Sequence, residues 1–459
     1  CGINGPVTFN VSNGPYNEQL IMTEVPGASA VNTVTFNGNG STINYLSTNT
    51  NERAVIKLNG ADHITFNNLV INALGTETTQ YGFGVQLMNN ADSNTINNCT
   101  VIINETSTST NYAGIVMSAS NTSAVGTGTV LSDFNTFSNN TILGGYYGIT
   151  NVGSNTEANG NNKIINNVIS DFYQYGIYVQ GSFNLQVEAN QISRPNRAAV
   201  TTFFGIYYTG LSVNSTITRN KISNPFGGNL SSTSTFNGIY FTGNDGFAAL
   251  ENKVTNNLIY NITGSGDVYG IYNTSSDNVW YYHNTIVLDG SPATSTETSI
   301  VRGFFQTTLA GGIEFKNNII SISRSGLATK YCMYFATTTS TISSNNNNFH
   351  ITSTAGSNNV GFRTTAQATL ANWQAASLQD ANSITEDPLY ANAGGGDFLP
   401  TNAIVNNLGT PVGVAVDINN NPRSATTPDM GAYEFTPGPC VAPPTPGTAH
   451  ANPNPVCTN

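Results

Sequence analysis

The 459-residue sequence contains few charged residues, since Asp, Glu, Lys and Arg together make up only 8% of it. The 25 acidic side chains outnumber the 14 basic ones, which gives a formal net charge of −11. No cluster of Lys or Arg is present, and a chain of this charge repels the phosphate backbone of nucleic acids. The composition therefore argues against nucleic-acid binding.

Long apolar runs and groups of metal ligands are also missing. No stretch of about 18 consecutive apolar residues occurs, so we expect no membrane span. No CxxC pair or Cys/His cluster predicts a metal site, and we expect no cofactor. The histidines are isolated from one another in the sequence: His63, His283, His350 and His450.

Cysteine is scarce, with five residues in the whole chain: Cys1, Cys99, Cys332, Cys440 and Cys457. Cys99 and Cys332 fall in distant repeats, so we expect them to be small, inert residues that cannot bridge each other. We expect Cys440 and Cys457 to form a disulfide, or each to pair within a following module. Because the sequence has no initiator Met or signal peptide, we expect a mature or excised portion of a longer protein, with a lipidated Cys1 as the alternative.

A repeat organises the rest of the chain. A motif of Gly, an apolar residue and often Tyr returns throughout, most cleanly as YGIYVQ at 175–180 and FFGIYYT at 203–209. Between these motifs lie short alternating strands and turns rich in Asn, Gly, Ser and Thr, with no helical apolar stripe. The anchor residues are 28 to 34 residues apart: Gly84, Gly114, Gly148, Gly176, Gly205, Gly238, Gly270, Gly303, Cys332 and Gly361. This pattern predicts an all-β, right-handed parallel β-helix, a solenoid with one coil per repeat.

Two columns of the coils can be predicted from the repeat. The residue after each anchor is always apolar and should stack inside: Val85, Ile115, Ile149, Ile177, Ile206, Ile239, Ile271, Phe304, Met333 and Phe362. An Asn column should hydrogen-bond along itself and form the turns: Asn68, Asn98, Asn140, Asn167, Asn190, Asn220, Asn257, Asn284, Asn318 and Asn347. We therefore interpret these Asn residues as structural.

The pattern divides the chain into four parts. Within 367–383, Leu370, Trp373 and Leu378 could form the apolar face of a short helix. Proline is dense after Pro437, which indicates an extended linker. The four parts are N-terminal coils that cover the first end (1–60), regular coils (61–366), a short helix with a closing segment (367–436), and a Pro-rich linker that opens a further, Ig-like module (437–459).

Stretches near both ends of the chain resemble known proteins. They are GINGPVTFNVSNGPYNEQL and PGASAVNTVTFNGNG near the start, and ITEDPLYAN, GGGDFLPTNAIVNNLG and VDINNNPRSATTPDMGAYEF near the end. The chain resembles the parallel β-helix family that includes pectate lyases and polygalacturonases, and more closely the β-helix regions of large secreted surface proteins of Bacteroidetes-type bacteria. The resemblance covers about residues 2–436 and implies a secreted or cell-surface protein with further modules. It is specific for architecture and not for activity.

The second residue after each anchor should face outward, opposite to the apolar column. Six consecutive repeats carry an aromatic residue there: Tyr178, Tyr207, Tyr240, Tyr272, Phe305 and Tyr334. Outward rings on a rigid strand face suit stacking on sugar rings, which makes glycans or a polysaccharide the predicted partner. The alternative is that the rings only pack on one another or are covered by the long loops.

Catalytic signals are weak, and no catalytic residue can be assigned. The carboxylates are scattered through turns and form no evident pair of the kind that glycoside hydrolysis needs: Asp171, Glu251, Asp267 and Asp277. Arg194 and Arg197 are the only close basic pair in the coils, and Pro195 between them indicates a turn. We therefore predict a non-catalytic stalk and glycan-binding adhesin. The alternatives are a β-helix polysaccharide lyase or glycoside hydrolase, and a structural subunit of an extracellular filament that associates head to tail.

Overall fold

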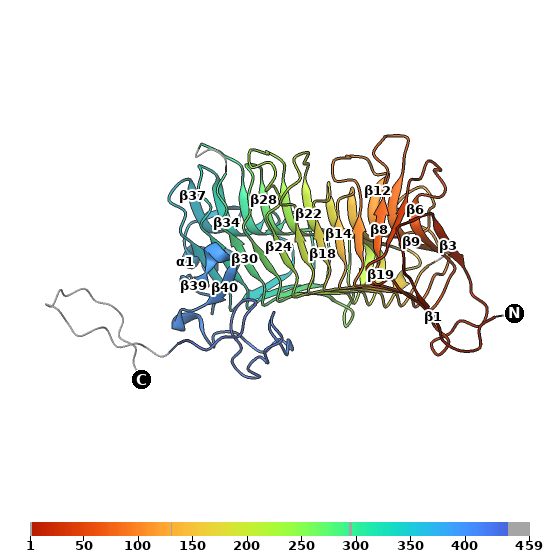
Figure 1. The fold of residues 1–459 in the computed structure, drawn as a ribbon. Coiled ribbons are helices and arrows are strands. Elements are labelled where there is room, and N and C mark those ends of the chain that lie inside the picture. Colours follow the sequence, from red (N-terminus) through yellow and green to blue (C-terminus); the bar gives the residue numbers. More distant parts are fainter. Residues whose placement is uncertain (1, 130, 293–295, 439–459) are drawn as a thin grey trace.

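The computed structural model describes residues 2–129, 131–292 and 296–438. Three long parallel sheets run the length of the molecule, and each of 12 coils contributes one strand to each sheet (Figure 1). The predicted all-β parallel β-helix is therefore confirmed. Among the described residues, no helix is long and apolar enough to cross a membrane.

The three sheets are named in the order in which a coil visits them. Sheet A contains β1 (Val7–Asn10), β4 (Val34–Asn37), β7 (Ile64–Asn67), β10 (Thr95–Asn97), β13 (Thr136–Ser138), β17 (Lys163–Ile165), β20 (Gln186–Glu188), β23 (Thr216–Thr218), β26 (Asn252–Thr255), β29 (Val279–Tyr282), β32 (Ile313–Lys316) and β35 (Ile342–Asn345). Sheet B contains β2 (Tyr16–Asn17), β5 (Thr42–Tyr45), β8 (Val70–Ala73), β11 (Thr100–Ile102), β14 (Thr141–Leu143), β18 (Val168–Ser170), β21 (Gln191–Ser193), β24 (Lys221–Ser223), β27 (Leu258–Tyr260), β30 (Thr285–Leu288), β33 (Ile319–Ile322) and β36 (Asn348–Ile351). Sheet C contains β3 (Leu20–Thr23), β6 (Ala54–Asn59), β9 (Gly82–Met88), β12 (Tyr112–Met117), β15 (Tyr147–Val152), β19 (Tyr175–Phe183), β22 (Phe203–Val213), β25 (Phe236–Thr242), β28 (Val268–Thr274), β31 (Val301–Gln306), β34 (Thr329–Phe335), β37 (Ser357–Arg363), the antiparallel β38 (Thr365–Gln367) and the short β16 (Asn159–Gly160) beside β19.

The inner column of sheet C forms as the repeat predicts. Ile177 pairs with Ile206, and the pairing continues through Ile239 to Ile271. These four side chains are fully buried and belong to one core cluster that extends through the coils. The stacked coils therefore share a single apolar interior, as a solenoid requires.

The anchor positions are small because the interior leaves no room for a side chain there. A Cβ on Gly176 would lie 2.6 Å from the carbonyl oxygen of Gly205 and 2.6 Å from a methyl group of Ile192. Cys332 takes the anchor position after Gly303, and it is buried and free. Cys99 is also free and buried. Cys1, Cys440 and Cys457 lie outside the described residues.

The last repeat is shifted by one residue from the predicted alignment. Met333 pairs with Gly361, and Tyr334 pairs with Phe362. The prediction that placed Phe362 inside was therefore wrong, because Gly361 occupies the inner column. A Cβ on Gly361 would lie 2.1 Å from the Trp373 ring, so the ring fills the space that an inner side chain would have taken.

Asparagine has two roles at successive positions of the corner between sheets A and B. Eight buried Asn residues form a column in which each of the first seven donates from Nδ2 to Oδ1 of the next: Asn140, Asn167, Asn190, Asn220, Asn257, Asn284, Asn318 and Asn347. The residue before it adopts a left-handed conformation, as at Asn166 with φ of 58°. Asn68 and Asn98, with φ of 55° and 52°, occupy this preceding position, so assigning them to the buried column was wrong. Cys99 stands in the column there, and its N–H donates to Asn140 Oδ1 at 2.9 Å.

The helix α1 (Leu370–Ser377) lies over the last coil, within the range where a helix was predicted. Trp373 is fully buried, packs against Phe335 with ring centroids 5.0 Å apart, and donates from Nε1 to Asp380 at 2.8 Å. Leu378 was expected on the same apolar face, and this was wrong. It ends the helix with φ of 58° and is 84% exposed.

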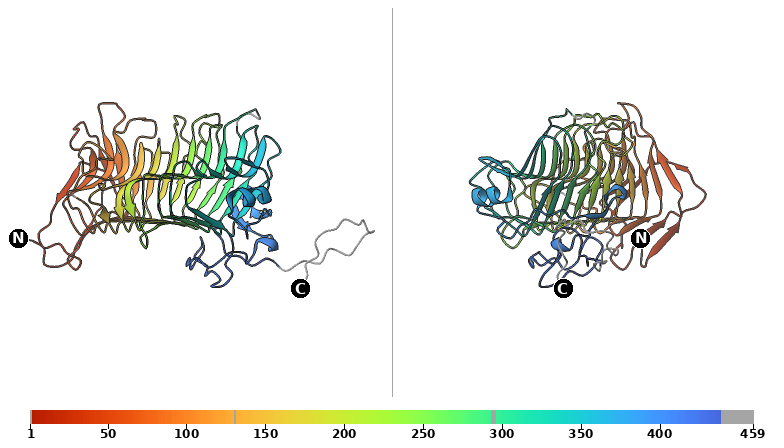
Figure 2. Two further views of the ribbon diagram at one scale, coloured as in Figure 1. Left: turned by 180° about the vertical axis from the view of Figure 1, so that it is seen from behind. Right: turned by 90° about the vertical axis from the view of Figure 1, so that its left-hand side faces the viewer.

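The closing segment, residues 384–436, follows the flank of the stack, although we expected it to close the C-terminal end. It appears in blue below the C-terminal half of the coils (Figures 1 and 2). Its described elements are β39 (Tyr390–Asn392), η1 (Ala393–Gly395), β40 (Asp397–Pro400) and η2 (Ala403–Val405). Phe398, Ile418 and Tyr433 pack against Leu258 and Val287 of sheet B to form a separate small core.

Candidate functional site

The predicted aromatic column is continuous in the structure. Tyr178, Tyr207, Tyr240, Tyr272, Phe305 and Tyr334 occupy equivalent positions of six successive strands of sheet C. Neighbouring rings have centroids 4.6 to 5.3 Å apart. Phe362 extends the column, with its ring 4.3 Å from that of Tyr334.

A second aromatic column runs beside the first, at the residue before each anchor. Its members are Tyr147, Tyr175, Phe204, Tyr269 and Tyr331, interrupted by Asn237 and Arg302. The two columns are in contact, as between Tyr175 and Tyr207 at 5.2 Å and between Tyr269 and Phe305 at 5.2 Å. Sequence reasoning missed this column, although the aromatic residue before the anchor glycine recurs in most of the motifs. We call the two columns together the aromatic face.

The aromatic face packs on itself and is still open to solvent. Tyr178, Tyr207, Tyr240 and Tyr272 are all partly exposed, whereas Phe305 is only 6% exposed. The rings are therefore held in place by one another but are not sealed beneath a loop. Such rings present a rigid apolar surface and lose little conformational freedom when a ligand binds.

Burial raises the pKa of several tyrosine hydroxyls on this face, which keeps them neutral at physiological pH. Burial, and then the nearby Tyr207 hydroxyl, raise the pKa of Tyr178 to about 12. Burial and the Asp267 carboxylate raise the pKa of Tyr269 to about 12. Burial also raises the pKa of Tyr240. Each hydroxyl can therefore both donate and accept a hydrogen bond, which suits the hydroxyl groups of a sugar.

Arg194 and Arg197, the basic pair noted in the sequence, are buried and stabilise the fold through hydrogen bonds. Arg194 is fully buried between the rings of Phe203 and Phe226, and its Nε donates to the Pro225 carbonyl at 2.7 Å. Burial lowers the pKa of Arg194 to about 9 and that of Arg197 to about 10. Arg197 is 3% exposed and donates to backbone carbonyls, among them that of Asp171 at 3.0 Å. Both side chains tie loops together, and neither is available to a polysaccharide.

The scattered carboxylates also act within the fold. Asp171 Oδ1 accepts the Asn196 N–H at 2.8 Å, and Asp277 Oδ1 accepts the Gly311 N–H at 2.6 Å. Asp267 Oδ1 accepts the Ile300 N–H at 2.8 Å. Each carboxylate therefore links its own coil to the next one, which explains why they occur at turns.

Glu251 lies in a different setting, on the outer side of sheet A. It lines a hollow of about 420 Å³ together with Trp280 and Glu314. Lys253 lies over the Trp280 ring at 5.3 Å, and Lys316 pairs with Glu314 at 2.7 Å. Sequence reasoning named Glu251 but missed Trp280 and Glu314, because only the coil register brings the three onto one surface.

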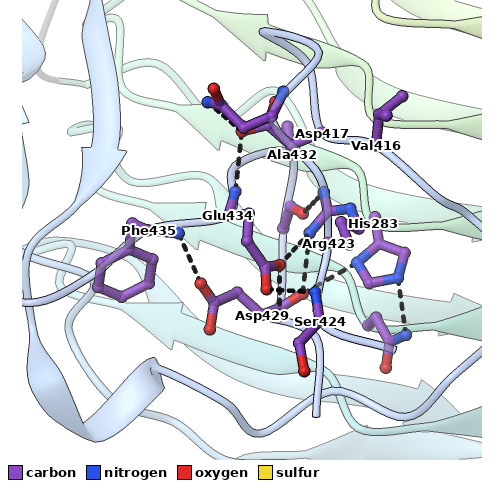
Figure 3. Close-up of polar contacts among 12 residues, drawn as sticks. His283, Val416, Asp417, Arg423, Ser424, Asp429, Ala432, Glu434 and Phe435 are labelled. Atoms are coloured by element: carbon purple, nitrogen blue, oxygen red, sulfur yellow. Dashed lines mark hydrogen bonds and ion pairs between the residues drawn. The ribbon is translucent and has the colours of Figure 1, made fainter. Parts of the chain in front are cut away.

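The closing segment contains a dense cluster of polar contacts (Figure 3). Arg423 lies at its centre and donates to Glu434 at 3.1 Å, to Asn256 of the coils at 2.7 Å and to the Gly431 carbonyl at 2.8 Å. Asp429 accepts the N–H groups of Asn407 and Phe435. Burial raises the pKa of Asp429 to about 6.

His283 connects this cluster to the coils. Its Nδ1 lies 2.9 Å from the Asp429 carbonyl oxygen, and its Nε2 lies 3.0 Å from Asn317 Nδ2 (Figure 3). Burial, and then the Arg423 charge, lower the pKa of His283 well below its ordinary value. Most polar groups of the cluster bond to one another or to the backbone, and Arg423 Nε is a buried donor without a partner. We interpret the cluster as the anchor of the closing segment. Within the described residues, no group of three or more His, Cys, Asp or Glu side chains could hold a metal ion.

Comparison with known proteins leaves the function open. No family model matches the chain, and no curated protein matches it. Similar solved structures include the Dettilon tailspike protein (14% identity over 83% of this chain and 61% of the tailspike, TM-score 0.43). They also include PfbA, a surface adhesin of Streptococcus pneumoniae (11% identity, 77% and 85% covered, TM-score 0.36), and pectate lyase Pel9A (14% identity, 94% and 87% covered, TM-score 0.35).

Proposed function

We propose that the protein is a non-catalytic, secreted or cell-surface module that binds glycans on its aromatic face and holds that face out on a rigid β-helical stalk. The observation that carries the proposal is the double column of rings on sheet C, in which Tyr178, Tyr207, Tyr240 and Tyr272 of the first column are partly exposed. Its rings repeat every 4.6 to 5.3 Å along the first column. An extended polysaccharide chain can lie along such a column and stack its apolar ring faces on the aromatic rings.

The fold supports this use of the face. The rings project from strands that are paired with neighbours on both sides, so the backbone beneath the face is fixed before a ligand arrives. Each ring is also held by contacts with rings of the adjacent column. Binding therefore costs little ordering of the protein, which favours affinity for a long, weakly contacting polymer.

The test is a glycan-binding screen of the purified protein and of the variant Tyr207→Ala/Tyr240→Ala/Tyr272→Ala. If each ring contributes about 1 kcal/mol of stacking, the triple variant should bind about 100-fold more weakly. A matched control removes three exposed rings elsewhere, Phe134→Ala/Phe183→Ala/Phe247→Ala, and should bind as the parent does. Equal binding by the triple tyrosine variant and the parent would remove the aromatic face from the proposal.

The rival function is a polysaccharide lyase or glycoside hydrolase, and the hollow around Trp280 is the observation that favours it. Glu251 and Glu314 line it together with the aromatic residue Trp280. Incubation with a polysaccharide panel should release neither reducing ends nor unsaturated products if the module only binds. Turnover by the parent that disappears in Glu314→Gln would establish the enzyme and overturn the non-catalytic proposal.

A further inference from the structure

Arg302 lies within the aromatic face and has no anionic partner. It follows Tyr269 in the second column and precedes Tyr331. Its guanidinium carbon lies 3.9 Å from the centre of the Phe305 ring and 4.0 Å from that of Tyr334. In the part of the chain that the structure describes, no carboxylate lies within ion-pair distance of Arg302, and its guanidinium donates no hydrogen bond to a protein group.

The burial of this cation sets it apart from an ordinary surface arginine. Arg302 is 8% exposed, and its Nε is a buried donor without a partner. A guanidinium withdrawn from water is costly unless a charge or hydrogen-bond acceptors compensate for it, and stacking on rings returns only part of that cost. The other deeply buried arginines meet this requirement, since Arg194 and Arg324 donate to backbone carbonyls.

Asp267 contacts this part of the face through Tyr269, and both of its carboxylate oxygens already accept hydrogen bonds. Asp267 accepts the Ile300 N–H at 2.8 Å on one oxygen and the Tyr269 hydroxyl at 3.2 Å on the other. Asp267 forms no ion pair with Arg302. The unmet requirement at Arg302 is for an anion that approaches from the open side of the aromatic face.

We infer that the aromatic face binds acidic glycans, and that Arg302 receives the carboxylate of a uronic acid while the adjacent, partly exposed ring of Tyr334 holds the sugar. The inference rests on the proposed glycan binding and assigns its ligand class. The planar guanidinium fork matches a carboxylate in two hydrogen bonds, which a Lys ammonium does not. The otherwise acidic chain, with a net charge of −11, limits this attraction to one subsite of the face.

The experiment compares one ligand in two charge states. Oligogalacturonates and the same oligosaccharides after reduction of their carboxyl groups to alcohols are titrated against the parent protein. A charge-assisted hydrogen bond contributes about 1.5–3 kcal/mol, so the parent should bind the acidic form about 10- to 100-fold more tightly. Arg302→Gln should lose this preference and keep its affinity for the reduced form, and Arg302→Lys should keep only part of the preference.

Two controls separate this inference from the proposed function. Lys253→Gln removes one positive charge on sheet A and should keep the preference for the acidic form. Thermal unfolding of each variant shows whether the face is still folded, and Arg302→Lys preserves the charge if the Gln variant is destabilised. Equal or weaker binding of the acidic form by the parent, or an unchanged preference in Arg302→Gln, would overturn the role of Arg302 while leaving glycan binding intact. If neither the acidic nor the reduced form binds, both the proposed glycan binding and the role of Arg302 are refuted.

Discussion

The strands at both ends of the stack pair in parallel with the neighbouring coil, but among the described residues only the C-terminal end is covered by further elements. At the C-terminal end, β38 and α1 cover the last coil, and Trp373 is fully buried. At the N-terminal end, β1 pairs only with β4 among the described strands, Phe9 is 49% exposed and Ile21 is 43% exposed. A hollow of about 300 Å³ opens there, lined by Phe9, Leu20 and Phe36. The repeat that stacks the coils therefore does not itself cover a terminal coil, which needs additional elements such as β38 and α1.

This difference bears on the filament alternative. Head-to-tail association by strand pairing needs a free strand edge at each end. The last strand of sheet C pairs with β38, and Asn348 of β36 pairs with Ile384. The covered end would first have to open, so the geometry favours a stalk over a filament of continuous coils.

The largest expected effect comes from removing the cover at the C-terminal end. Trp373→Ala should lower the free energy of unfolding of the last coils by about 3–5 kcal/mol, because a large buried ring is lost beside Phe335 and Gly361. Hydrogen exchange of β34 and β37 measures this loss, and β9 and β12 should be unaffected. Leu378→Ala is the matched control, since Leu378 is 84% exposed. Unchanged protection of β34 and β37 in Trp373→Ala would contradict the role of the cover.

The sequence predicts the repeating part of this molecule well and its exceptions poorly. Ile177 and Ile206 could be paired from spacing alone, because each coil imposes the same inward position on the next. Phe362 could not be placed, since its position depends on the Trp373 ring that reaches Gly361 from outside the repeat. The aromatic column was visible as a period, whereas the missing partner of Arg302 could be recognised only from three-dimensional neighbours.

His283 and Asp429, which both anchor the closing segment, should make its stability depend on pH in opposite directions. A His held neutral by burial, with its pKa below the unfolded value, stabilises the docked state fully above pH about 6.5, and the stability falls by about 1.4 kcal/mol per pH unit below it. Asp429 acts in the opposite direction. Its pKa is raised to about 6, so its contribution is complete below its ordinary value near 4 and is lost as the pH rises through about 6.

His283→Asn should therefore weaken or reverse the loss of docking of the closing segment at acidic pH. Asn tolerates the left-handed conformation at this position, where φ is 55°, and it cannot titrate. Between pH 7 and 5, protection of the backbone amides at 397–435 should fall less steeply in the variant than in the parent, or rise. His63→Asn, at another left-handed position with φ of 57°, is the control and should respond as the parent does. Parallel pH profiles for parent and His283→Asn would show that His283 does not govern docking.

The smallest expected effect concerns the open N-terminal end. Phe9, Phe36 and Phe66 stack in one column of sheet A, with centroids 4.9 and 5.0 Å apart, and exposure falls from 49% at Phe9 to 0% at Phe66. Because Phe9 buries only part of its ring, Phe9→Ala should lower the free energy of unfolding by less than about 1.5 kcal/mol, whereas Phe66→Ala should cost about 3–5 kcal/mol. Urea unfolding measures both changes.

Sedimentation at high concentration shows, in addition, whether the exposed ring promotes self-association. If Phe9→Ala costs as much as Phe66→Ala, the N-terminal coil is covered in solution and the contrast between the two ends does not hold.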